Sequence, residues 1–219
     1  MTAEPRPLRA DAERNRRRIL DAARTVFAEH GLGVGVDAVA REAGVGVGTI
    51  YRRFPTKQDL LKAVIEDGVA RLADAVEEAA AEPDPWTAFA GAVRAFAEGI
   101  ARDRGFVEVI HGDPGYQPMG VEGRDRLMNG LDALLRRAQD DGCVRGDVVV
   151  DDIAALSMVA ARLPRWRLQA QPELWERYLA LTLDGLRVEG AHELPHEPPL
   201  SASEAPGRRP ATAVRRRRA

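Results

Sequence analysis

The sequence predicts an all-α protein, with a small three-helix N-terminal domain followed by a larger helical bundle. Apolar residues recur three, four and seven positions apart in segment after segment. No segment alternates apolar and polar residues for long, and Val148–Val150 is too short to argue for a sheet. Ala, Leu, Val, Arg and Glu dominate while aromatic residues make up only 5%, a composition that favours helix.

The first three helices are expected close together near the N-terminus. One runs from about Arg14 to Gly31, with Ile19, Ala23 and Phe27 on one face. Two short ones follow, residues 36–43 ended by a glycine and residues 47–54 ended by a proline. The spacing of the apolar residues therefore places a compact three-helix unit before residue 57.

The remaining helices are longer and form the second part of the chain. We expect them at residues 57–81, 86–102, 121–140, 151–170 and 173–188. Prolines separate the first two, and Asp113-Pro114-Gly115 marks a loop that lasts until Gly120.

These elements divide the chain into four parts. Residues 1–12 mix Pro, Arg and Glu without an apolar period and are expected to form a disordered arm. Residues 13–56 form the first domain and residues 57–188 the bundle. Residues 189–219, rich in Pro, Ser, Glu and Arg, are expected to be a disordered basic tail that ends in four arginines.

Charge and cysteine content narrow the class of protein. Residues 1–60 hold 11 Arg and Lys against 8 Asp and Glu, residues 189–219 hold 6 against 4, and the net charge of −2 leaves −7 for residues 61–188. A basic head on an acidic body suits contact with phosphate at one end. A single cysteine, no long apolar span and no signal-peptide pattern predict a cytoplasmic protein.

Residues 32–57 hold two short helices separated by a tight glycine-containing turn, as a helix-turn-helix requires. Apolar side chains are expected to pack the second helix across the first: Val39, Ala40, Val45, Ile50 and Phe54. The residues left to face outward are Val47, Gly48, Thr49, Arg52 and Arg53. Such a short face of small and basic residues can enter a DNA major groove about 12 Å wide.

Residues 43–57 read Ala-Gly-Val-Gly-Val-Gly-Thr-Ile-Tyr-Arg-Arg-Phe-Pro-Thr-Lys. This resembles the TetR/AcrR family of transcriptional regulators, whose members typically read Ala-Gly-Val-Ser-X-Gly-Thr-Leu-Tyr-X-His-Phe-X-X-Lys, and residues 19–23 and 27–31 match a further family stretch. The resemblance implies a dimeric, cofactor-free repressor. A small molecule would release it from a palindromic operator by shifting one conformational equilibrium shared with DNA binding.

The resemblance also assigns roles in DNA binding. Thr49 and Tyr51 would contact phosphate or base edges, and Arg53 stands where a family histidine reaches the backbone. Lys57 would hold a phosphate at the start of the long helix. Two further roles follow from chemistry, since Arg52 can bind guanine O6 and N7 together and Val47 can pack on a thymine methyl. The full expected set is Val36, Val47, Gly48, Thr49, Tyr51, Arg52, Arg53 and Lys57.

Some features of the head depart from the family or stay open. Gly35 and Gly46 replace the usual capping Thr and Ser, which removes two hydroxyls from the DNA side. The glycine-rich turn does not follow a strand and fails the pattern of a nucleotide-binding loop. Arg14 and Arg16–Arg18 form either a DNA-approaching arm or a solvated helix start. Tyr51 faces either DNA or the core.

The bundle is expected to dimerise and to bind an effector. By resemblance the dimer forms through the last two helices, and both carry apolar residues on more than one face: Ile153, Leu156, Val159, Ala160, Leu163, Leu174, Trp175, Tyr178, Leu179, Leu181, Leu183 and Leu186. The residues expected around an effector are mostly apolar, although stripes of this kind are usually plain core: Phe89, Val93, Phe96, Phe106, Ile110, His111, Tyr116, Met119, Met128, Leu131, Met158 and Arg162, with Trp166 as a further anchor. This lining suggests a hydrophobic or amphipathic effector.

The sequence does not favour a redox, metal or catalytic site. Cys143 follows two aspartates, which should raise the pKa of its thiol and blunt a redox role. The four histidines are scattered and predict no metal site. Neither Ser157 nor Ser201 has a histidine partner in a sequence motif, so no catalytic residues are expected. A body that only dimerises, without an effector pocket, remains an alternative.

Overall fold

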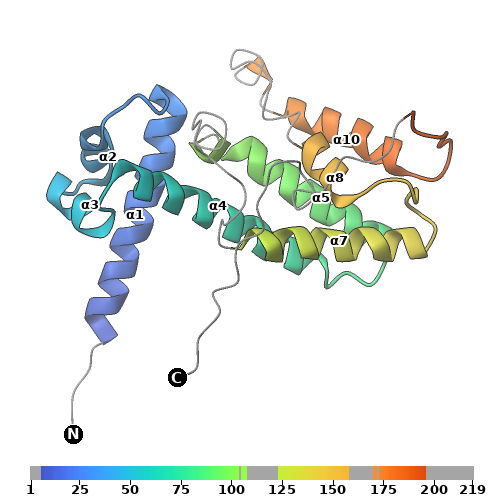
Figure 1. Ribbon diagram of the computed structural model, residues 1–219, viewed down its shortest axis with the longest axis horizontal. Helices are drawn as coiled ribbons and strands as arrows, with labels where there is room; N and C mark the ends of the chain where they lie inside the picture. Colours follow the sequence, from blue (N-terminus) through green and yellow to red (C-terminus); the bar gives the residue numbers. More distant parts are fainter. Residues whose placement is uncertain (1–5, 104, 108–122, 158–169, 172, 196–219) are drawn as a thin grey trace, which may run out of the picture.

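The computed structural model describes residues 6–103, 105–107, 123–157, 170–171 and 173–195. Across these residues the chain is helical, apart from loops and an isolated β-bridge between Val144 and Arg187. Figure 1 shows a small N-terminal head and a larger body joined by the long helix α4. The described helices are α1 (Arg6–His30), α2 (Val36–Ala43), α3 (Val47–Arg53), α4 (Lys57–Ala79), α5 (Pro85–Arg102), α7 (Arg124–Asp140), α8 (Val150–Ser157) and α10 (Leu174–Leu186).

The head consists of α1, α2, α3 and the first turns of α4. Its innermost side chains, at most 1% exposed, include Ile19, Leu20, Phe27, Val39 and Ile50. Helix α2 has the bounds that the sequence predicts. Helix α3 ends one residue early, because Phe54 adopts an extended conformation and turns its ring into the core.

Helix α1 is longer than the apolar pattern predicts. It begins at Arg6, so that residues 6–12 of the expected disordered arm are helical. Apolar spacing locates only the part of a helix whose residues repeat with the helical period, and residues 6–12 show no such period. Ion pairs along the helix, Arg14 with Asp11 and Arg17 with Glu13, support them instead. Figure 1 shows these turns extending beyond the rest of the head.

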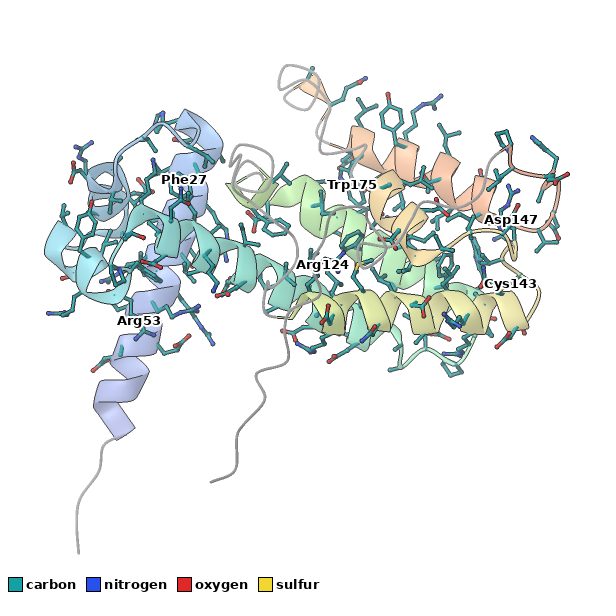
Figure 2. All side chains as sticks on the ribbon, viewed as in Figure 1. Phe27, Arg53, Arg124, Cys143, Asp147 and Trp175 are labelled. Carbon is teal, nitrogen blue, oxygen red and sulfur yellow. The ribbon has the colours of Figure 1, made fainter. Side chains whose placement is uncertain are left out.

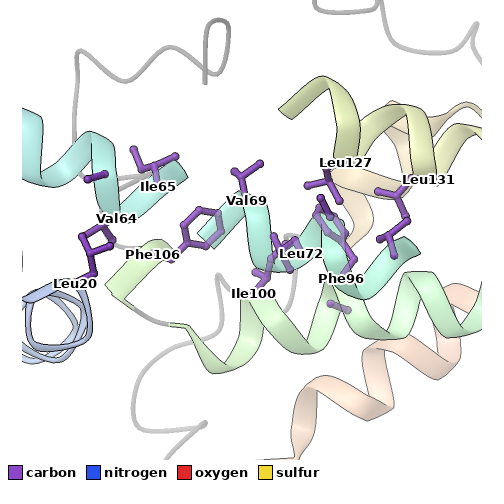
Figure 3. Packing of buried hydrophobic residues seen from close by; sticks show 14 of the residues in the cluster. Leu20, Val64, Ile65, Val69, Leu72, Phe96, Ile100, Phe106, Leu127 and Leu131 are labelled. Carbon is purple, nitrogen blue, oxygen red and sulfur yellow. The ribbon is translucent and has the colours of Figure 1, made fainter. Parts of the chain in front are cut away.

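Helix α4 connects head and body. Its start is fixed by a capping box in which Thr56 accepts from the backbone N–H of Asp59 and Asp59 accepts from the backbone N–H of Thr56. Its buried residues continue from the head into the body: Leu60, Leu61, Val64, Ile65, Val69, Leu72 and Val76. The later ones pack between α5 and α7 (Figure 3).

The body is formed by α4, α5, α7, α8 and α10 around one continuous core. Its helices lie close to their predicted positions, and α10 ends at Leu186 because Arg187 pairs with Val144 and stacks over the ring of Trp86, 3.8 Å from its centroid. Figure 2 shows Trp175 on the side of α10 that faces the other helices. Residues 158–169 of the helix predicted at 151–170 lie outside the described residues.

The start of the expected disordered tail lies against the body. Arg145 donates a hydrogen bond to the carbonyl oxygen of His192 at 2.6 Å, so that the chain just past α10 is held beside the loop after α7. Residues 196–219, with the terminal arginines, lie outside the described residues. No helix in the described part of the chain is long and apolar enough to cross a membrane.

Candidate nucleic-acid interface

The turn between α2 and α3 depends on one glycine. Gly44 has φ 62°, a left-handed conformation that glycine adopts without strain, and its N–H donates to the carbonyl oxygen of Arg41. The N–H of Val45 donates to Ala40 in turn, at 3.0 Å. This closure redirects the chain so that α3 crosses α2 with Ile50 buried between them. The helix-turn-helix expected from the sequence is therefore present.

The outer face of α3 carries the residues that the sequence places there. Gly48, Arg52 and Arg53 are exposed, and Tyr51 is 46% exposed. Val47 and Thr49 are half-buried at the edge of this face. Tyr51 is thus not a core residue. The face combines two guanidinium groups, one phenol and a stretch of backbone uncovered at Gly48.

The start of α2 differs from expectation at one residue. Val36 is only 6% exposed, because it shares the inward face of α2 with Val39, Ala40 and Ala43. Its side chain belongs to the core of the head. Gly35 and Gly46 are the N-cap residues of α2 and α3, and neither helix has a side-chain cap, as the sequence predicts.

Lys57 makes its hydrogen bonds within the head. Its ammonium group donates to the carbonyl oxygen of Val34 at 2.8 Å and also to that of Leu32. The side chain is half-buried. The lysine expected to hold a phosphate is therefore bonded to the loop between α1 and α2.

The arginines at the start of α1 do not act as one cluster. The side chains of Arg14 and Arg17 are 70% and 74% exposed, whereas Arg16 faces α4 with its guanidinium 3.8 Å from Asp67. Only part of the run is therefore available to a partner such as DNA.

Arg24 forms a polar junction between head and body. Its side chain, 11% exposed, pairs with Asp67 of α4, and its Nε lies 3.2 Å from a carboxylate oxygen of Asp103 at the end of α5. Asp103 also pairs with Arg71 and accepts from the backbone N–H of Phe106 at 2.9 Å. One guanidinium thus contacts both the connecting helix and the body.

Comparison with known proteins gives two family matches and several structural relatives. Residues 19–64 match the model for bacterial regulatory proteins of the tetR family, and residues 84–188 match the C-terminal domain of SbtR-like transcriptional regulators. The crystal structure of a TetR transcription regulatory protein from Mycobacterium vanbaalenii is 40% identical, with a TM-score of 0.61, over 83% of this chain and 100% of that one. The chain belongs to the TetR family.

Other relatives agree with this assignment. The TetR transcriptional regulator SCO0520 from Streptomyces coelicolor is 36% identical over 78% of this chain and 98% of that one, with a TM-score of 0.57. Helix-turn-helix transcriptional regulators of Staphylococcus aureus are 42% identical over 60 residues, which is 27% of this chain and about a third of theirs, 32%. As a TetR-family member the chain is a transcriptional regulator, a class of protein that is not enzymatic.

The expected effector residues of this TetR-family body fall into two groups. Phe89, Val93, Phe96, Phe106 and Leu131 are buried in the core, and Met128 is half-buried. The other expected residues lie outside the described part of the chain: Ile110, His111, Tyr116, Met119, Met158, Arg162 and Trp166. Phe106 packs on α4 so tightly that a Cβ at Gly68 would come under 3.0 Å from its ring (Figure 3).

The outer face of α10 carries apolar residues spaced four and three positions apart. Leu181 is 59% exposed, with Leu174 and Tyr178 half-buried on the same face. Trp175, Leu179 and Leu186 fill the buried face. Leu156 of α8 is a further exposed apolar side chain, at 40%. Helix α10 is thus apolar on two faces, as the sequence predicts.

Cys143 follows α7 in a short turn (Figure 2). Burial raises the pKa of its thiol above the ordinary value, and the charge of Asp141 adds to this effect. The direction is the one that the sequence predicts. Among the described residues no group of three or more His, Cys, Asp or Glu could hold a metal ion.

Proposed function

We propose that this TetR-family regulator is a homodimeric repressor that binds a palindromic operator and leaves it when a hydrophobic or amphipathic small molecule binds the body. The observation that carries the proposal is the outer face of α3. It presents Tyr51, Arg52 and Arg53 together on a helix short enough to lie within a major groove.

Each residue of this face has a role that its chemistry supports. The fork of Arg52 pairs with O6 and N7 of a guanine, and Arg53, in the last turn, reaches the phosphate backbone. Tyr51 and Thr49 donate hydroxyl hydrogen bonds to phosphate or base edges. Gly48 allows the helix backbone close to the groove, and Val47 contacts a thymine methyl.

The face of α10 supports the dimer. An exposed apolar stripe of this kind is covered most simply by the same stripe of a second copy across a two-fold axis. Two heads related by that axis read two half-sites in opposite orientation, and the operator is then a palindrome.

The junction at Arg24 supports a link between effector and DNA binding. Asp103 forms an ion pair with Arg24, accepts a hydrogen bond from Arg71, and accepts from the backbone N–H of Phe106. The position of the helical residues after α5 and the position of α1 therefore depend on each other. An effector that binds beside Phe106 therefore shifts the head relative to the body. Coupling of this type amounts to about 1–3 kcal/mol and acts in both directions.

Selection of duplexes from a random DNA pool by the purified dimer tests the proposal. An enriched palindrome supports sequence-specific reading by two symmetric heads and supplies an operator for effector screening. Binding that falls steeply with salt and enriches no sequence would overturn it. An operator complex that no apolar compound releases would favour a body that only dimerises.

A further inference from the structure

Lys57, the first residue of α4, reaches back across the head to the loop between α1 and α2. Its Nζ donates to the carbonyl oxygens of Val34 and Leu32, which lie 23 and 25 residues earlier in the chain. The side chain that makes these bonds is half-buried. Two of the three ammonium hydrogens are thus engaged within the protein.

The loop that receives these bonds is weakly determined by its own sequence. It holds Gly33 and Gly35, a Cβ at Gly33 would meet nothing within 4 Å, and Gly35 caps α2 without a side-chain hydrogen bond. Glycines leave a loop many conformations in the absence of outside contacts. Bonds from Lys57 therefore contribute directly to where α2 begins.

The other end of the contact is rigid. The capping box of Thr56 and Asp59 fixes the first turn of α4, and only residues 54–56 separate α4 from the end of α3. Helix α4 thus holds the helix-turn-helix at both ends, through the chain after α3 and through Lys57 before α2. Helix α4 also contacts α1 of the head before it continues into the body (Figure 1).

We propose that Lys57 is a positioning residue for DNA recognition: it ties the start of α2 to α4 and so sets the orientation of α3, in place of the phosphate contact that the family resemblance implies. This inference rests on the proposed DNA-binding function. It also makes α4 and the helix-turn-helix a single rigid unit, so that a movement of α4 reaches the recognition helix.

A labelling experiment on the free protein tests the contact without mutation. Lys57 and Lys62 are the only lysines in the chain, and Lys62 is 64% exposed on the same helix. An amine-acylating reagent, followed by mass spectrometry, is expected to modify Lys62 at least about tenfold faster than Lys57, since hydrogen bonds and burial protect the latter. Equal rates in the free protein, with protection of Lys57 only when DNA is added, would overturn the proposal.

Variants of the full-length dimer separate positioning from phosphate binding. We expect K57M to lower affinity for the selected operator about tenfold while affinity for unrelated duplex changes less than about twofold, and K57R, which can still donate two hydrogen bonds, to retain most of the operator affinity. The matched control K62M removes the same charge from α4 and should leave both affinities within about twofold.

A direct phosphate contact gives a different result. Both affinities would then fall alike in K57M, and the slope of log K against log salt on unrelated duplex would decrease by about 0.9. The melting temperatures of K57M and K57R show whether a loss of operator affinity comes from unfolding. A variant that melts near the wild-type temperature but binds the operator weakly has kept its fold and lost the orientation of α3. If the wild-type protein selects no operator, the proposed function fails, while the labelling of the free protein still decides whether Lys57 is bound to the loop.

Discussion

Gly105 lies directly against the backbone of Arg24, so close that a Cβ at Gly105 would come under 3.0 Å from the Arg24 carbonyl oxygen. The residue with this backbone contact also carries the guanidinium that pairs with Asp67 and Asp103. Head and body therefore meet through backbone packing and through charge at the same place. The backbone contact between Gly105 and Arg24 transmits small displacements, because no flexible side chain lies between the two backbones to absorb them.

The first prediction concerns this contact. Gly105→Ala forces the helical residues after α5 away from α1 and should lower the free energy of unfolding by about 1–3 kcal/mol. It should also change operator affinity, since the head shifts with α1. The matched control is Gly146→Ala, where a Cβ meets nothing within 4 Å. Urea unfolding and operator titration of both variants check this. Equal unfolding free energies and equal operator affinities in Gly105→Ala and Gly146→Ala would contradict a tight junction between head and body.

A second prediction concerns the start of the recognition helix. Gly46 has φ −69° and ψ 143°, a conformation open to any residue, and a Cβ there meets only the Thr49 hydroxyl at 4.0 Å. Gly46→Ser should therefore add a cap, stabilise the protein by a few tenths of a kcal/mol, and raise operator affinity through a new hydroxyl contact. Gly44→Ser is the contrasting control, because φ is 62° at that position. It should lose about 1 kcal/mol of stability.

A third prediction tests the dimer. Leu181→Glu places a charge in the centre of the exposed apolar face of α10 and should give a folded monomer in light scattering, with an unchanged helical spectrum. Leu194→Glu is the matched control, since this leucine is 40% exposed and lies outside α10. A Leu181→Glu protein that remains dimeric would place the interface elsewhere.

A fourth prediction follows from the raised pKa of Cys143. The thiolate is the reactive form, so alkylation should stay slow at neutral pH and rise only above the ordinary thiol range. Asp141→Asn removes one cause of the shift and should move the midpoint of the alkylation rate to lower pH. The single cysteine makes mass spectrometry a direct readout. Rapid alkylation at pH 7 would contradict the buried environment.

The sequence predicts α2 and the turn to α3 well because their determinants are local. Gly44 supplies the left-handed residue, Pro55 follows α3, and the apolar spacing orients Ile50 inward. The outward orientation of Arg52 and Arg53 follows from the same spacing.

What the sequence misses depends on partners far along the chain. Lys57 finds acceptors 23 and 25 residues away. Val36 is the exception, because it lies three, four and seven positions before Val39, Ala40 and Ala43, and this local spacing already indicates an inward side chain. Arg24 meets Asp103 only when the end of α5 reaches α1. The early start of α1 is missed for another reason, since its first turns are polar and show no period.

The central claim is that the exposed face of α3 reads the operator, and repeating the duplex selection with Arg52→Ala tests it most directly. Arg136→Ala, which removes a 73% exposed arginine from α7, is the matched control. The account predicts that Arg52→Ala loses the guanine preference at one symmetric pair of operator positions and binds about 5–150-fold more weakly, a loss of roughly 1–3 kcal/mol, while the control selects the wild-type palindrome. An unchanged palindrome from Arg52→Ala would contradict base reading by this face.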